Sequence, residues 1–245
     1  MATRNPSEYD DRREALATYF DSTARQAWID LTSDAKVSGI RATVRAGRDA
    51  MRANLLDWLP TDLRRTKVLD AGCGTGSLAV AAACRGAEVT GIDVAPGLIE
   101  VARDRTPSFI GHGRIHWRSG DMLDPALGTF GHVVAMDSLI HYTLPDMVWA
   151  LAALTQRCTG SIVFTFAPYT PLLGAMNGLF TRIETTLARE RRFGISEVLI
   201  AQLLPQNAAP PLKESPAAVA YSPVQAGAGS ELAAFAMPVN LPFRQ

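Results

Sequence analysis

The chain has 245 residues, enough for one α/β domain but too few for two complete ones. It carries 24 basic and 24 acidic side chains and so lacks the basic excess of a nucleic-acid-binding protein. The polar N-terminus and the lack of a long apolar run predict neither a signal peptide nor a membrane span. The 3 cysteines have no paired or metal-ligand spacing, so we expect a reduced, cytoplasmic protein without a metal site.

Residues 1–60 predict a helical cap, with a short helix over 10–19 and a longer helix over 37–59 that Pro60 ends. Apolar residues recur at helical spacing on the longer helix: Ile40, Val44, Met51 and Leu55. Beside them runs a basic stripe: Arg41, Arg45, Arg48 and Arg52. Such a stripe is usually a solvated surface. The alternative is that Arg45 or Arg48 meets an acidic substrate, because a guanidinium suits a carboxylate.

Residues 61–180 alternate between short apolar runs and helical segments, which predicts a parallel sheet with helices on both faces. Strands are expected at 67–71, 88–92, 114–117, 133–136 and 161–166, and helices at 77–85 and 96–105. Four carboxylates fall at the ends of consecutive strands: Asp70, Asp93, Asp121 and Asp137. Open α/β sheets bind ligands outside these ends, so the four residues predict one site.

The first strand runs into the sequence KVLDAGCGTG, with glycines at positions 72, 74 and 76. Gly72, Gly74 and Gly76 accept positive φ and let the backbone approach a ligand. Their spacing differs from the dinucleotide fingerprint, in which the third glycine comes one residue later. With Asp70 before the loop and Asp93 ending the next strand, the pattern resembles motif I of the class I S-adenosylmethionine-dependent methyltransferases. The alternative is an ordinary βα turn followed by a surface aspartate.

This resemblance implies a Rossmann-like class I methyltransferase sheet and S-adenosyl-L-methionine as methyl donor. In that family the glycine loop packs against the amino-acid part of the cofactor, and Asp93 would hydrogen-bond the ribose hydroxyls. Asp121, in the run RSGDM, would hold the adenine amino group with Met122 beside it, although Gly-Asp is also an ordinary turn pair. Asp137 is a further candidate for the cofactor site.

The stretch after the fourth strand, DSLIHYTLPDM, places His141 and Tyr142 where a methyl acceptor should approach. Together with YFDSTARQAW before the core and FAPYTPLL after the fifth strand, it resembles the magnesium-protoporphyrin IX O-methyltransferases of bacteriochlorophyll biosynthesis. The resemblance covers about residues 19–180. Where family members often carry a tyrosine shortly after the tryptophan that matches Trp28, this chain has Thr32.

This second resemblance implies methylation of one propionate of magnesium protoporphyrin IX, which gives the 13-monomethyl ester. His141 would orient the propionate or contact the magnesium, and Tyr19 is a second catalytic candidate. A magnesium chelatase subunit is the implied partner, with at most peripheral association with the photosynthetic membrane. Two other functions stay open: methylation of another small molecule, or binding of cofactor or porphyrin without catalysis.

Residues 181–245 depart from the family pattern. They show no strand pattern that would close the sheet, and from Pro205 onward the chain is rich in proline and alanine, which is typical of a poorly ordered segment. We hypothesise that a frameshift near Phe180 produced this tail; translation of the DNA in the other two frames tests the hypothesis. The closing strands are therefore doubtful: if the tail is aberrant, the sixth and seventh strands are missing and a sheet edge is exposed.

Overall fold

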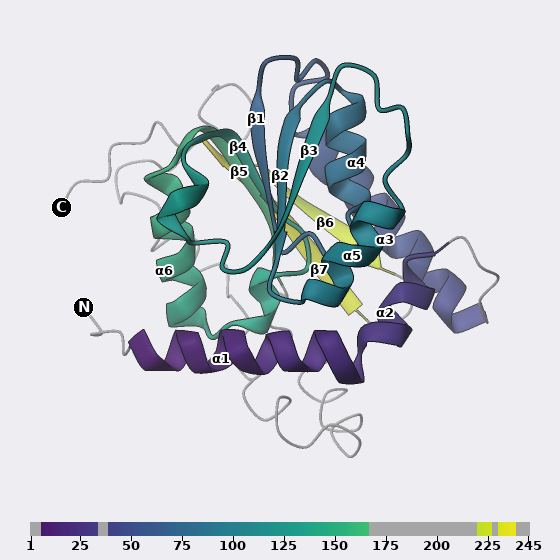
Figure 1. Ribbon diagram of the computed structural model, residues 1–245, viewed down its shortest axis with the longest axis vertical. Coiled ribbons are helices and arrows are strands. Elements are labelled where there is room, and N and C mark those ends of the chain that lie inside the picture. The colour runs from purple at the N-terminus through teal and green to yellow at the C-terminus, as the bar shows by residue number, and fades with distance from the viewer. Residues whose placement is uncertain (1–5, 34–38, 167–219, 227–229, 239–245) are drawn as a thin grey trace.

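The structure, a computed structural model, describes residues 6–33, 39–166, 220–226 and 230–238. Within these ranges the strands are β1 (Lys67–Ala71), β2 (Glu88–Asp93), β3 (Arg114–Ser119), β4 (Phe130–Ala135), β5 (Cys158–Phe166), β6 (Ala220–Ala226) and β7 (Ser230–Pro238). They form one sheet in the order β3-β2-β1-β4-β5-β7-β6 (Figure 1). The first five strands are parallel, and β7 lies antiparallel between β5 and β6.

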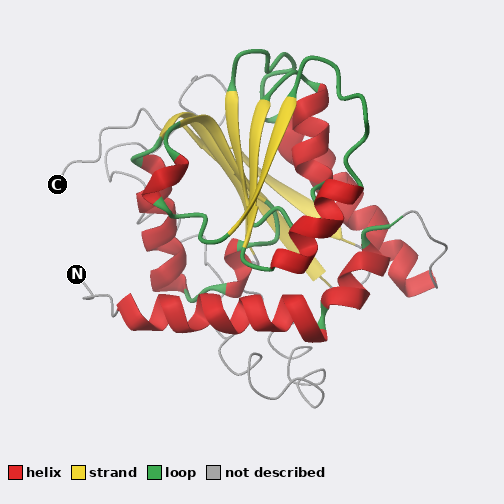
Figure 2. Ribbon diagram, viewed as in Figure 1, coloured by secondary structure: helices red, strands yellow, loops and turns green. Residues whose placement is uncertain are grey.

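Helices cover both faces of this sheet (Figure 2). The α-helices of the described residues are α1 (Pro6–Thr18), α2 (Arg25–Leu31), α3 (Gly39–Asp57), α4 (Ser77–Cys84), α5 (Pro96–Asp104) and α6 (Leu144–Thr155). Val68 and Leu69 are both fully buried, but Val68 packs with residues of α3 and α4 whereas Leu69 packs with residues of α6. Because the parallel strands are buried on both faces, they appear in the sequence as continuous apolar runs.

The predicted core elements are confirmed with small changes of bounds. β1 covers the predicted residues, β2 ends one residue later, and β5 begins three residues earlier, at Cys158. Two helices, α2 and α6, were not predicted from the sequence. A start signal for α6 was present, because the Thr143 hydroxyl caps the helix by accepting the Asp146 N–H at 3.4 Å, and Pro145 occupies the first turn.

The expectation that the closing strands are missing is wrong for residues 220–226 and 230–238. β7 pairs with β5 from Ser161↔Pro238 to Phe166↔Ala233, and β6 pairs with β7. Their sequences, AYSPVQA and SELAAFAMP, are poor in β-branched residues, so local propensity hides them. β7 is paired on both sides, with β5 and with β6, and β6 is paired with β7. The frameshift hypothesis concerns the coding DNA and stays a prediction, and residues 181–219 lie outside the described part of the chain.

The N-terminal helices lie at the carboxyl ends of the parallel strands, where α1 crosses beneath them (Figure 1). They are fixed to α5 by polar contacts. The Asp21 carboxylate accepts the Gly97 N–H at 2.7 Å in the first turn of α5. At the other end of α5, Arg105 donates to the Thr32 hydroxyl at 2.9 Å and to the Ile29 carbonyl at 2.9 Å. The cap is therefore docked on the element that follows β2.

The predicted apolar face of α3 is buried only in its C-terminal half. Met51 and Leu55 are fully buried, whereas Val44 is 43% exposed. Val44 therefore lies outside the buried part of this face, and the core residues of α3 come from its C-terminal half.

None of the described helices has the length and apolar character that a bilayer crossing requires. The three cysteines, Cys73, Cys84 and Cys158, are free thiols. Among the residues described, the His, Cys, Asp and Glu side chains form no group of three that could hold a metal ion.

Candidate active site

The glycine loop follows β1 and turns the chain into α4 through three left-handed residues. The φ angles are 78° at Gly72, 54° at Gly74 and 84° at Gly76. A Cβ at Gly72 would overlap the Cβ of Ser138, which lies beyond the end of β4. Glycine is therefore required here both by the backbone conformation and by the close approach of two loops.

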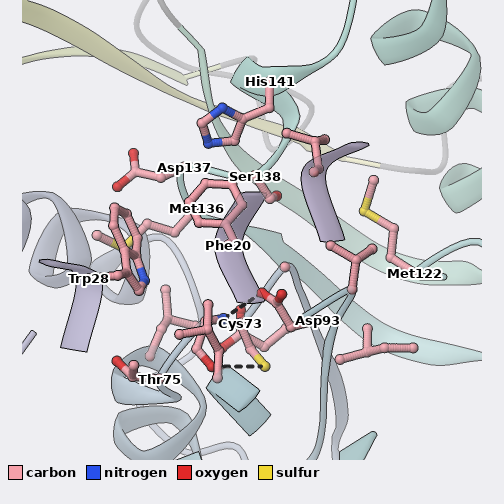
Figure 3. A pocket seen from close by; sticks show the side chains of 18 of the residues that line it. Phe20, Trp28, Cys73, Thr75, Asp93, Met122, Met136, Asp137, Ser138 and His141 are labelled. Carbon is pink, nitrogen blue, oxygen red and sulfur yellow. Dashed lines mark hydrogen bonds between the residues drawn. The ribbon is translucent and has the colours of Figure 1, made fainter. Parts of the chain in front are cut away.

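A cavity opens beside this loop at the carboxyl ends of the strands, with a volume of about 840 Å³ that includes open solvent (Figure 3). Seven predicted site residues line it: Asp70, Gly72, Gly74, Asp93, Met122, Asp137 and His141. Gly76, Asp121 and Tyr19 are not among the lining residues. The sequence-based site is thus brought together in large part, by loops from β1, β2, β3 and β4.

Asp93 is buried at the end of β2 and ties two turns together. One carboxylate oxygen accepts the Gly74 N–H at 2.8 Å, and the other accepts the Ala95 N–H at 2.9 Å. Burial raises the pKa of Asp93, against the lowering effect of these backbone donors. The carboxylate therefore shapes the glycine loop and also faces the cavity.

Asp70 is 1% exposed, and burial raises the pKa of its carboxyl to about 7. Its Oδ2 atom has no hydrogen-bond partner among the described residues, and the same holds for the Oγ atom of Ser138. Buried polar atoms are costly unless they are paired. Both residues line the cavity, so they are suited to receive the polar groups of a small ligand.

The Asp121 carboxylate contacts the N-terminal cap. It accepts the Tyr9 hydroxyl at 2.9 Å, an Arg13 N–H at 2.8 Å and the Leu123 N–H at 2.8 Å. Tyr9 is almost fully buried and stacks on Tyr142 with ring centroids 5.1 Å apart. Sequence reasoning missed this role because the partners are more than 100 positions away. Its neighbour Met122 does line the cavity. The predicted contact of Asp121 and Met122 with the adenine of the cofactor stays a prediction.

Asp137 follows β4 with a φ of 55° and is held from two sides. Its N–H donates to the Thr165 hydroxyl at 2.7 Å. Its Oδ2 atom accepts a hydrogen bond from Nη1 of Arg48 on α3. The Arg48 guanidinium also lies over the Trp28 ring, 4.4 Å from its centroid. Arg48 and Trp28 both line the cavity. Trp28 was not among the predicted site residues, whereas Arg48 was one of the two arginines considered for contact with an acidic substrate.

His141 ends a 3₁₀ turn, Leu139–His141, and lies on the opposite side of the cavity from Asp93 (Figure 3). Its ring meets the Phe20 ring edge to face, with centroids 5.2 Å apart. The Tyr19 ring contacts the same Phe20 ring, with centroids 5.2 Å apart. Phe20, one position after the predicted Tyr19, lines the cavity, whereas Tyr19 does not.

Two sequence families match the chain. The family described as "Methyltransferase domain" matches residues 68–159, and the family described as "Magnesium-protoporphyrin IX methyltransferase C-terminus" matches residues 135–198. The second match continues past Phe180, so the family resemblance extends farther than the sequence motifs indicated.

Relatives and solved structures agree with these matches. The chain is 51% identical over 171 residues to the magnesium-protoporphyrin O-methyltransferase of Rhodobacter capsulatus, which covers 69% of this chain and 76% of the relative. It is 29% identical over 178 residues to that of Synechocystis, with the same coverage. A crystal structure of the Synechocystis magnesium protoporphyrin IX methyltransferase with bound SAH superposes with a TM-score of 0.71, at 22% identity, over 92% of this chain and 99% of the other. The structure thus has a Rossmann-like methyltransferase fold, and the chain belongs to the magnesium-protoporphyrin O-methyltransferase family.

Proposed function

We propose that this protein transfers a methyl group from S-adenosyl-L-methionine to a propionate carboxylate of magnesium protoporphyrin IX and gives the 13-monomethyl ester. The observation that carries the proposal is the 51% identity to a magnesium-protoporphyrin O-methyltransferase across 76% of that relative. It is supported by a cavity at the strand ends, where methyltransferase-type sheets bind ligands.

The residues present fit the methyl donor. Gly72 and Gly74 line the cavity without a side chain, Asp70 and Ser138 present buried unpaired oxygens, and Asp93 faces the cavity from the end of β2. Gly72, Gly74, Gly76, Asp70 and Asp137 would then lie on the amino-acid side of the donor and Asp93 on the ribose side. Met122, with Asp121, would lie on the adenine side. When bound, S-adenosylmethionine supplies a methyl group already activated by its sulfonium sulfur.

The chain's own task is to position the acceptor and exclude water. A propionate is ionised at pH 7, so the reaction needs no strong general base. His141 is proposed to orient the propionate or to contact the magnesium, since it lines the cavity opposite Asp93. Phe20 and Trp28 supply an apolar wall from the cap, and a dry site strengthens each polar contact. Tyr19 remains the second candidate, and it would act through its contact with Phe20, which lines the cavity.

We further propose a division into a cap (1–60), a cofactor-binding core (61–180) and a C-terminal segment (181–245). A magnesium chelatase subunit that releases the porphyrin is the proposed partner, and association with the photosynthetic membrane is proposed to be peripheral. Both proposals are supported only by the apolar character of the substrate and by the family. Co-purification with chelatase subunits and flotation with photosynthetic membranes would test them.

The experiment that tests the function is turnover of the purified full chain with S-adenosylmethionine and magnesium protoporphyrin IX. The monomethyl ester is resolved by chromatography, and a reaction without the methyl donor is the control. Formation of the ester supports the proposal. Binding of the donor with no ester formed from this porphyrin, but with turnover of a quinone precursor, would favour a different acceptor. Binding without any turnover would favour a non-catalytic protein.

A further inference from the structure

The cavity holds three carboxylates and one permanent positive charge among its described lining residues. The carboxylates belong to Asp70, Asp93 and Asp137, and the positive charge belongs to Arg48. The Arg48 side chain is 19% exposed, so it is mostly desolvated but still reached from the cavity. Removing a guanidinium from water carries a large desolvation penalty unless the group is paired with an opposite charge.

Arg48 is held in one orientation by two neighbours. The Asp137 carboxylate accepts a hydrogen bond from Nη1 of Arg48. The Asp137 side chain is itself only 6% exposed and is held by Thr165. The Trp28 ring lies against the guanidinium, and the Nε1 atom of Trp28 lies 3.0 Å from the place where a Cβ would stand on Gly74. Arg48 is therefore linked through a single aromatic ring to the glycine loop.

Most donors of this guanidinium are left for a ligand. Arginine has five N–H donors in a planar fork, and Asp137 is the acceptor placed against Arg48 among the described residues. We propose that Arg48 is a carboxylate-binding residue of the cavity, which stays paired with Asp137 through Nη1 and uses its remaining donors to hold a carboxylate of a bound ligand. Planar fork-to-fork pairing is the geometry in which arginine binds carboxylates most strongly.

The other arginines of the α3 stripe with described side chains do not have this property. Arg45 donates to the backbone carbonyls of Leu31 at 3.0 Å and Asp30 at 2.9 Å, so it fixes the end of α2. Arg52 pairs with Asp49 at 2.9 Å, one turn along α3. Neither lines the cavity, so the stripe is divided into one site residue and two structural ones.

The inference rests on the proposed function for the identity of the ligand, and two carboxylates could occupy the site. One is the amino-acid carboxylate of the methyl donor, which the link through Trp28 to Gly74 favours. The other is a propionate of the porphyrin, which the shared cavity with His141 permits. Both groups are carboxylates. Two pairs of ligands, whose members differ only in whether the carboxylate is free, distinguish which of them Arg48 binds.

The test is calorimetric or fluorescence binding to wild-type protein and the Arg48→Gln variant. One ligand pair is S-adenosylhomocysteine and its decarboxylated analogue; the other is magnesium protoporphyrin IX and its dimethyl ester. We expect Arg48→Gln to lower the affinity of the protein for one of the two acids, S-adenosylhomocysteine or magnesium protoporphyrin IX, by about tenfold or more. This is the loss expected when a charge-assisted hydrogen bond is removed. The carboxyl-free partner of that acid should bind both proteins equally, and Arg48→Lys should recover part of the loss. Arg52→Gln is the matched control on the same helix.

Equal weakening of an acid and its carboxyl-free analogue would overturn the inference and leave Arg48 a structural residue. Unchanged binding of both acids would also overturn it. If the wild type forms the monomethyl ester in either case, the proposed function stands while this inference falls. If the wild type binds no porphyrin, the proposed function falls, and the S-adenosylhomocysteine pair still decides the role of Arg48.

Discussion

Replacement of Asp70 by Asn should change how the stability of the ligand-free protein depends on pH. Burial raises the pKa of Asp70 from 3.8 to about 7. The unfolded chain releases this proton below pH 5, whereas the folded chain keeps it until about pH 7. The folded state thus binds more protons in this window, so stability falls as pH rises through it and levels off above. The full difference is roughly 4 kcal/mol, of which roughly 2.5 kcal/mol falls between pH 5 and pH 8.

The assay is urea unfolding of wild-type protein and Asp70→Asn at pH 5, 6, 7 and 8. Asn carries no proton to lose, so the free energy of unfolding of wild type minus variant should fall steadily by roughly 2.5 kcal/mol across the series. Asp62→Asn is the control: arginine hydrogen bonds lower the pKa of Asp62 to about 2, so its contribution is lost only below the tested range. If the free energy of unfolding of wild type minus that of Asp70→Asn does not change with pH, Asp70 does not keep its proton in the folded protein up to about pH 7, and the reasoning is refuted.

Three further changes have definite expected outcomes. Gly72→Ala should lower the melting temperature and abolish S-adenosylhomocysteine binding, because φ is 78° and the new Cβ would strike Ser138; normal binding by calorimetry would contradict the close approach of the two loops. His141→Ala should lower kcat for the monomethyl ester by about 100-fold, the loss that misplacement of a reactant causes, with S-adenosylhomocysteine binding unchanged; a loss of that binding instead would move His141 to the cofactor site. Arg105→Ala removes the donor to Thr32 and should lower the free energy of unfolding by about 1–3 kcal/mol, and equal urea midpoints for variant and wild type would show that the cap does not depend on it.

The sequence predicts the parts of the fold that are encoded locally. β1 and its glycine turn follow from a short run with three apolar residues and from three glycines, and the strand ends next to Asp93 and Asp137 follow from further apolar runs. The left-handed Gly72 and Gly74 have the φ values that their spacing predicted. Such features depend on residues close together in the chain, which is why one sequence is enough.

The remainder depends on contacts between distant segments. Phe20 and Arg48 line the cavity because the Tyr19–Thr23 helical turn and α3 pack there, and no local pattern distinguishes Arg48 from Arg45 on the same stripe. The Asp121 carboxylate meets Tyr9 for the same reason. β6 and β7 were missed because their residues have weak strand preference, and β7 pairs with β5, a segment far away in the chain, while β6 pairs with β7.

The insertion of β7 between β5 and β6 has a consequence for synthesis on the ribosome. β5 ends at Phe166 and its partner begins at Ser230, so 63 residues, 167–229, must be translated between them. At ribosomal speeds this takes roughly 3–13 s, counted at about 5–20 residues per second. During that interval β7 is not yet present to pair with the outer edge of β5, a β-branched and aromatic run. The nascent chain is therefore most open to aggregation, and most in need of a chaperone, after its methyltransferase core has been made and before its last strand emerges.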